Sequence, residues 1–247
     1  MIVSLPMYDR PETAAANDVF WGLIREALGY GPERLNRALD PWEAWEHPDL
    51  LLSQTCGLPY RTRLQGKVSL IASPDFGLPD CPPGYYNSVL VARADDRRSL
   101  DDLAAARVVI NQDHSQSGFA AIMSHFAACA IVPNIATQSG GHAASARMVA
   151  EGAADLAAID GNTWRMIQAF DPWAGALREI ERTAPTPAMP YITGPTQDAA
   201  PLRAAMVAAV DRLPDATRAL LGLRGITLVP PQAFLAVPTP KFATDLT

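Results

Sequence analysis

The chain has 247 residues, of which 49% are hydrophobic and 19% charged, and its formal net charge is -6. This is an ordinary globular composition, and the length suffices for one large domain or two smaller lobes. The acidic balance, without any Lys/Arg-rich stretch of five or more residues, argues against nucleic-acid binding through a basic face.

The first residues do not resemble a secretory leader. Met1 leads directly into IVSLPM, without a basic segment or a cleavage site. No apolar run approaches the ~20 residues that span a bilayer. We therefore expect a periplasmic protein if a leader has been removed from this chain, and otherwise a cytoplasmic one.

In the first part of the chain, apolar spacing predicts alternating strands and helices. Strands are expected at 2–7, 49–55, 67–73 and 88–93, and helices at 14–31, 32–39, 41–47 and 99–106, the last capped by Ser99. The stretch 74–87 is rich in Pro and Gly, which predicts a loop.

The alternation continues beyond residue 106. Strands are expected at 107–112, 131–138, 156–160, 177–183 and 189–194, and helices at 118–130, 142–150, 161–170, 200–213 and 215–223. Asp155 is expected in a solvated turn, and the Pro-containing tail 228–247 on the surface.

This order predicts an α/β fold in which each of two lobes is a mostly parallel sheet flanked by helices. The β-like connectors 88–93 and 189–194 suggest two hinge strands. Lobe 1 would then be discontinuous, made of 1–92 and 190–247, and lobe 2 would be the inserted segment 93–189. Such a hinge predicts a cleft that closes on a ligand.

The loop DHSQSG (113–118) lies between an expected strand and an expected helix. The first amides of a helix lack intrahelical partners and carry partial positive charge. Ser115, Gln116 and Ser117 add side-chain donors, and Gly118 permits close approach of the backbone. The loop could therefore bind an oxyanion. Alternatively, Ser115 or Ser117 could simply cap the helix.

Several polar residues at the expected strand ends are further candidates, because ligands bind at the carboxyl ends of parallel strands. His142 follows Gly140 and Gly141 and could donate to an anion, or could be structural. Asp160 could attract a cationic group of a zwitterionic ligand, or could cap the next helix. The remaining candidates are Tyr8, Thr55 and Tyr86, of which Tyr86 could equally be an ordinary buried aromatic.

Catalysis is the rival interpretation. Either Ser115 or Ser117 could form a hydrolytic triad with His142 and Asp160, although the G-x-S-x-G elbow is absent. The sequence contains no H-E-x-x-H motif and no P-loop, so we expect no metal and no cofactor.

Cys56 and Cys81 lie in loops where a disulfide could form, and Cys129 is expected to be a buried thiol in a helix.

Several stretches, taken in order, carry a family resemblance: SLPMYD, LLLSQTCGLPYRTRL, GYYNSVLVARADDRRSLDDLAAARVVIN, DHSQSG, SGGHAAS, GAADLAAID and MPYITG. Together they resemble the phosphate/phosphonate-type periplasmic substrate-binding proteins of ABC transporters. One departure is Gln116, which stands in the second place of a loop that usually reads Ser-Ser/Thr-Ser-Gly.

The resemblance implies a type 2 periplasmic-binding-protein fold and a non-catalytic receptor for a small oxyanion, most directly a phosphonate or phosphate-type ligand. It favours the ligand-binding role for Ser115, Gln116, Ser117 and His142. It also implies an ABC permease as a partner, and we expect a monomer that binds no nucleic acid. The alternative is a cytoplasmic enzyme or ligand sensor on the same fold, for example a biosynthetic enzyme or a hydrolase that uses Ser117 and His142.

Overall fold

Residues 1–240, which the computed structural model describes, divide into two units, each with its own sheet. Unit 1 comprises Met1–Tyr85 and Pro187–Leu235, and unit 2 comprises Tyr86–Thr186 with residues 236–240. The chain leaves unit 1 within β4 (Tyr85–Tyr86) and returns within β10 (Thr186–Pro187). These two short strands pair with each other.

The sheet of unit 1 has the strand order β1-β2-β11-β3-β12. Its strands are β1 (Ile2–Ser4), β2 (Leu50–Gln54), β3 (Ser69–Asp75), β11 (Tyr191–Thr193) and β12 (Gly225–Thr227). β1 and β2 are parallel, whereas β11 runs antiparallel to both β2 and β3.

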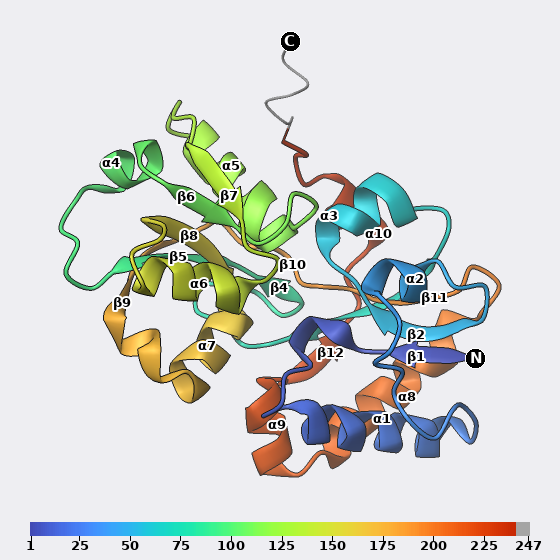
Figure 1. The fold of residues 1–247 in the computed structure, drawn as a ribbon. Helices are drawn as coiled ribbons and strands as arrows, with labels where there is room; N and C mark the ends of the chain where they lie inside the picture. The colour runs from blue at the N-terminus through green and yellow to red at the C-terminus, as the bar shows by residue number, and fades with distance from the viewer. Residues whose placement is uncertain (241–247) are drawn as a thin grey trace. The chain divides into compact units, whose positions relative to one another are not determined.

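Helices cover both faces of this sheet (Figure 1). On one side lie α1 (Ala14–Leu28), α8 (Ala199–Arg212) and α9 (Asp215–Leu221). On the other lie α2 (Pro41–Trp45), α3 (Gly57–Pro59) with the adjoining turn η2 (Tyr60–Leu64), and α10 (Pro231–Leu235). A short turn, η1 (Pro6–Tyr8), follows β1.

In helix α1, the apolar residues at helical spacing form one buried stripe. Phe20, Trp21 and Ile24 lie on one stripe and are at most 1% exposed. Gly29 ends the helix in the left-handed conformation, with φ of 77°.

The helix expected at 32–39 is not formed, so that prediction is wrong. Trp21 Nε1 donates to the carbonyl of Pro32, and Asn36 Oδ1 accepts from the amides of Ala38 and Leu39. Local side-chain acceptors of this kind compete with helical hydrogen bonds.

The sheet of unit 2 has the strand order β7-β6-β8-β5-β9. Its strands are β5 (Ser88–Arg93), β6 (Val108–Ile110), β7 (Ile135–Gln138), β8 (Leu156–Asp160) and β9 (Leu177–Arg182). β6 is parallel to β7 and β8, whereas β5 is antiparallel to β8 and β9. The fold class is α/β as expected, but both sheets are mixed because β5 and β11 run against their neighbours.

The helical segments of unit 2 again lie on both faces of its sheet (Figure 1). They are α4 (Leu100–Ala105), η3 (Gln116–Ala120) with α5 (Ala121–Ala127), α6 (His142–Ala150), α7 (Gly161–Phe170) and η4 (Pro172–Ala176). Ser99 caps α4 through a capping box with Asp102, as expected. Val91, Val109, Val149 and Trp164 belong to the core between the sheet and helices α6 and α7.

One expectation about a single side chain is wrong. Cys129 is exposed, because it lies beyond the last turn of α5. Cys56 is buried and Cys81 is half-buried, and a disulfide between them stays a prediction.

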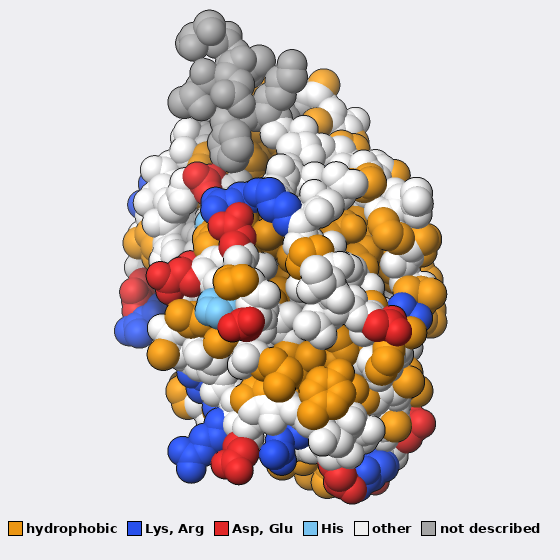
Figure 2. Space-filling view, turned by 90° about the vertical axis from the view of Figure 1, so that its right-hand side faces the viewer, with side chains coloured by type: hydrophobic (Ala, Val, Ile, Leu, Met, Phe, Trp, Pro, Cys, Tyr) orange, Lys and Arg blue, Asp and Glu red, His pale blue; other side chains and the backbone are white. Residues whose placement is uncertain are grey.

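Asp155 is also not in a solvated turn. It pairs with Arg98 and Arg107, at 2.7 Å and 2.8 Å, and accepts the amide of Arg107. Acidic and basic side chains are mixed over the face shown in Figure 2, in keeping with such pairs.

None of the helices within residues 1–240 is long and apolar enough to cross a membrane.

The ion pairs of Asp155 with Arg98 and Arg107 should make the free energy of unfolding depend on pH in the acidic range. Hydrogen bonds from Arg107 and then Arg98 hold the pKa of Asp155 well below its ordinary value. A carboxylate with a lowered folded-state pKa stabilises the protein above its unfolded pKa, ~3.9, and loses that contribution as the pH falls further. Between about pH 5 and pH 2, wild type should lose about 1–3 kcal/mol more unfolding free energy than Asp155→Asn. Urea titrations across this range measure the difference, and parallel curves would contradict the prediction.

Candidate functional site

The parallel strands of unit 2 bring three chain segments to one edge of the sheet. β6 ends before Asn111, β7 ends before Ser139, and β8 ends at Asp160. The amides of Ser139 and Gly140 donate to the carbonyls of Ile110 and Asn111, which ties the second segment to the first. The carboxyl edge of such a sheet is where α/β proteins bind ligands.

Ser115 caps the helical segment that begins at Gln116. Its Oγ accepts the amide of Gly118 at 3.0 Å, so the capping role we had left open is filled by this residue. Its hydroxyl proton remains available as a donor, because the capping bond uses only an oxygen lone pair. The amides that donate to the carbonyls of Ser115 and Gln116 belong to residues that follow Ser117 in the chain. The amide of Ser117 itself therefore lacks an intrahelical acceptor.

Ser117 does not cap the helix but contacts His142. Its Oγ lies 2.7 Å from Nε2 of His142, which is the first residue of α6. Asn111 Nδ2 lies 3.4 Å from the same nitrogen, and Ser115 Oγ lies 3.5 Å from Ser117 Oγ. The structure thus brings the DHSQSG loop and the Gly-Gly-His segment together.

This cluster is buried. Ser115, Gln116 and Ser117 are at most 4% exposed, and Asn111 is 8% exposed. Burial lowers the pKa of His142 to about 4, and the backbone of Ala158 offsets part of the fall. His142 is therefore neutral near pH 7, so an anion there meets an uncharged imidazole and not an imidazolium.

Asn111 is the residue of this site that we did not predict. Its Oδ1 is buried without a hydrogen-bond partner. The rule that selected Asp160, a polar residue at the end of a parallel strand, would have selected Asn111 as well. Its presence also explains Gly118: a Cβ built on Gly118 would lie 1.9 Å from Asn111 Oδ1 and 3.2 Å from His142 Cε1.

Asp160 fills the capping role that was one of its two alternatives. Its Oδ1 accepts the amide of Thr163 at 2.7 Å, at the start of α7, and the residue is fully buried. It also pairs with Ser88 across the β5–β8 ladder. Contact of its carboxylate with a cationic ligand group stays a prediction.

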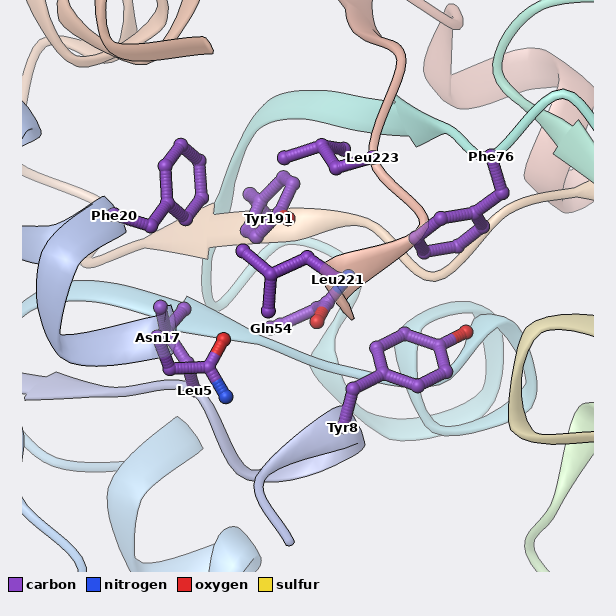
Figure 3. Close-up of a pocket in the computed structure, with 9 residues that line it drawn as sticks. All are labelled: Leu5, Tyr8, Asn17, Phe20, Gln54, Phe76, Tyr191, Leu221 and Leu223. Atoms are coloured by element: carbon purple, nitrogen blue, oxygen red, sulfur yellow. The ribbon is translucent and has the colours of Figure 1, made fainter. Parts of the chain in front are cut away.

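Unit 1 contains a small pocket of its own (Figure 3). Its volume is ≈ 20 Å³, about enough for one water molecule. Tyr8 and Phe76 line one end, with their rings edge to face at 5.1 Å between centroids. The other lining residues are Leu5, Asn17, Phe20, Gln54, Tyr191, Leu221 and Leu223.

The other two candidates outside the cluster are both buried. Thr55 lies directly after β2, and its Oγ1 has no hydrogen-bond partner. Tyr86 is 1% exposed in β4. Ligand contact by Tyr8, Thr55 and Tyr86 stays a prediction, since each is described only within its own unit.

A family model for the periplasmic substrate-binding protein of phosphonate ABC transporters matches residues 53–231. The chain belongs to this family. Its members are substrate-binding components and not enzymes, so the hydrolase interpretation of Ser117 and His142 is set aside. In the described part of the chain, no group of three or more His, Cys, Asp and Glu side chains could hold a metal ion.

Solved structures share the type 2 periplasmic-binding-protein fold with this chain. A binding component of an ABC phosphonate transporter from Pseudomonas aeruginosa has a TM-score of 0.74 at 13% identity, covering 94% of this chain and 83% of its own. PhnD1 from Prochlorococcus marinus, in complex with methylphosphonate, has a TM-score of 0.72 at 14% identity, covering 94% of both chains. A histidine kinase sensor domain has a TM-score of 0.63 at 17% identity, covering 91% of this chain and 97% of its own. No curated protein sequence matches the chain.

The close approach of Gly118 to Asn111 gives a stability prediction. Gly118→Ala should lower the free energy of unfolding by about 1–3 kcal/mol, because the new methyl group must displace the Asn111 amide. Gly175→Ala is the matched control, since a Cβ there meets nothing within 4 Å. Urea denaturation of both variants measures the difference, and equal stabilities would contradict this packing.

Proposed function

We propose that this protein binds a phosphonate or a phosphate-type oxyanion at the helix start formed by Ser115, Gln116 and Ser117, with His142 beside it. The observation that carries the proposal is the contact of Ser117 Oγ with His142 Nε2 in a family member. The methylphosphonate bound by PhnD1 makes that anion the first ligand to test.

The chemistry of the cluster suits a small oxyanion. The amide of Ser117 and the hydroxyl of Ser115 are donors at the start of a helical segment, where partial positive charge favours an anion. No Lys or Arg side chain is required, because buried hydrogen-bond donors can hold an anion by themselves. Burial strengthens each such bond by lowering the local dielectric.

Asp160 bears on which class of oxyanion the proposed site would accept. Its buried carboxylate lies at the end of β8, on the strand adjacent to β6. A carboxylate near a bound anion would disfavour a plain dianion and favour a ligand with an amino group. An aminoalkylphosphonate combines both features, so we include this class among the proposed ligands.

In the cell, we propose that the protein delivers its ligand to an ABC permease from the periplasm. The family to which it belongs consists of the periplasmic components of such transporters. We further propose that it acts as a monomer and that ligand binding favours a closed state through its greater affinity for that state.

Removing the Ser117 hydroxyl should have a larger effect on ligand affinity than on the free energy of unfolding. Ser117→Ala should lower the affinity for methylphosphonate about tenfold or more, since one buried hydrogen bond to a charged group is lost. The free energy of unfolding should fall by no more than about 1 kcal/mol, since Asn111 still faces His142 Nε2. Isothermal titration calorimetry and urea denaturation measure the two effects.

The matched control is Ser124→Ala, an exposed serine on the adjoining helix α5. This variant should bind methylphosphonate as wild type does. Unchanged affinity in Ser117→Ala, or no binding of methylphosphonate, phosphate or an aminoalkylphosphonate by wild type, would contradict the proposed function.

A further inference from the structure

We propose that Arg37 is a positioning residue for ligand binding: through the Asp9 carboxylate, its guanidinium holds the turn that carries Tyr8 at the carboxyl edge of the unit 1 sheet. Arg37 acts on the ligand through this turn and not by touching the ligand. The role rests on the function proposed above and on the predicted ligand contact of Tyr8.

Tyr8 lies at the edge of the sheet where a ligand is expected. β1 is parallel to β2, and β11 runs antiparallel to both β2 and β3, so β1, β2 and β3 all end at one edge. Tyr8 ends the turn η1 that follows β1, and Phe76 follows β3. Their rings pack edge to face at one end of the pocket in Figure 3. The position of the Tyr8 ring therefore matters at the edge where α/β proteins bind ligands.

The carboxylate of Asp9, directly after Tyr8, accepts hydrogen bonds from two other parts of unit 1. Arg37 Nε lies 2.6 Å from Oδ2, and Arg37 Nη2 lies 3.2 Å from Oδ1, so the guanidinium binds both carboxylate oxygens. Asn17 Nδ2, from helix α1, donates to Oδ1 at 3.0 Å. A two-point contact between guanidinium and carboxylate fixes orientation as well as distance, so Arg37 restrains the residue that follows Tyr8.

Arg37 is itself attached to helix α1 by two further contacts. Its Nη1 pairs with the Asp18 carboxylate at 2.8 Å, and its Nη2 donates to the carbonyl of Ala14 at 3.1 Å. The guanidinium therefore joins the start of α1 to the Tyr8 turn, although Arg37 and Asp9 are 28 positions apart in the chain.

The loop 32–39, where we expected a helix, holds Arg37 in this place. The side chain of Leu35 is buried, and the amide of Asn36 donates to the carbonyl of Val3 in β1 at 2.7 Å. The loop is thus anchored to the strand that leads into the Tyr8 turn. A regular helix would use the Asn36 amide in its own hydrogen bonds, so the irregular loop is what allows this anchor.

A separate hydrogen bond holds the backbone of Tyr8 without Arg37. The hydroxyl of Thr13, a fully buried residue, donates to the carbonyl of Tyr8 at 2.6 Å. The turn therefore keeps its path when the Arg37 contact is lost, and only the restraint on its Asp9 side is removed. A partly exposed ion pair adds little to stability, whereas a binding group that is ~1 Å too loose loses affinity.

Calorimetry with methylphosphonate on the full chain tests this role. Arg37→Gln should lower the affinity about three- to tenfold, because the turn that carries Tyr8 is less restrained. The matched control is Arg212→Gln, since Arg212 binds both carboxylate oxygens of Glu26, at 3.0 Å and 2.9 Å, near the other end of α1. This control should bind methylphosphonate as wild type does, and urea denaturation should give the two variants similar midpoints.

A double-mutant cycle distinguishes positioning of Tyr8 from a merely structural role. In Tyr8→Ala the contact that Arg37 positions is absent, so adding Arg37→Gln should change the affinity by less than about twofold. Unchanged affinity in Arg37→Gln or in Tyr8→Ala, an equal loss in Arg212→Gln, or full additivity in the double variant would overturn the positioning role and leave the proposed function standing. No binding of methylphosphonate, phosphate or an aminoalkylphosphonate by wild type would overturn both.

Discussion

The candidate site of this protein depends on one buried hydrogen bond, between the Ser117 hydroxyl and the imidazole of His142. The two residues are 25 positions apart in the chain. They meet because β6 is parallel to both β7 and β8, so the segments that follow β6 and β7 leave the sheet at one edge. Each residue also begins or nearly begins a helical segment that packs on this sheet.

That hydrogen bond orders the groups around it. Asn111 extends from the end of β6 toward the same imidazole nitrogen, and the absence of a side chain at Gly118 leaves room for its amide. Ser115 caps the helical segment and so holds the loop in the conformation that presents Ser117. The site is therefore built by side chains that stabilise the local fold as well as by those proposed to bind the anion.

Much of the fold followed from sequence periodicity, and the failures have identifiable causes. Helix α1 and strand β5 appeared where their apolar patterns predicted them. The expected helix at 32–39 did not form, because Asn36 satisfies nearby amides and Pro32 accepts from a tryptophan. Each sheet also contains a strand that runs against its neighbours, which the sequence did not predict, since strand direction depends on pairing partners that are distant in the sequence.

The sequence alone determined which residues have suitable chemistry: hydroxyls and a glycine at a helix start, a histidine after two glycines, and polar groups at strand ends. It also carried the family resemblance that residues 53–231 bear out. Only the tertiary structure decided that Ser115 caps while Ser117 contacts His142, that Asn111 joins them, and that the imidazole is neutral. Those features depend on distances between segments and on burial, which local sequence does not encode because strand pairing and packing set them.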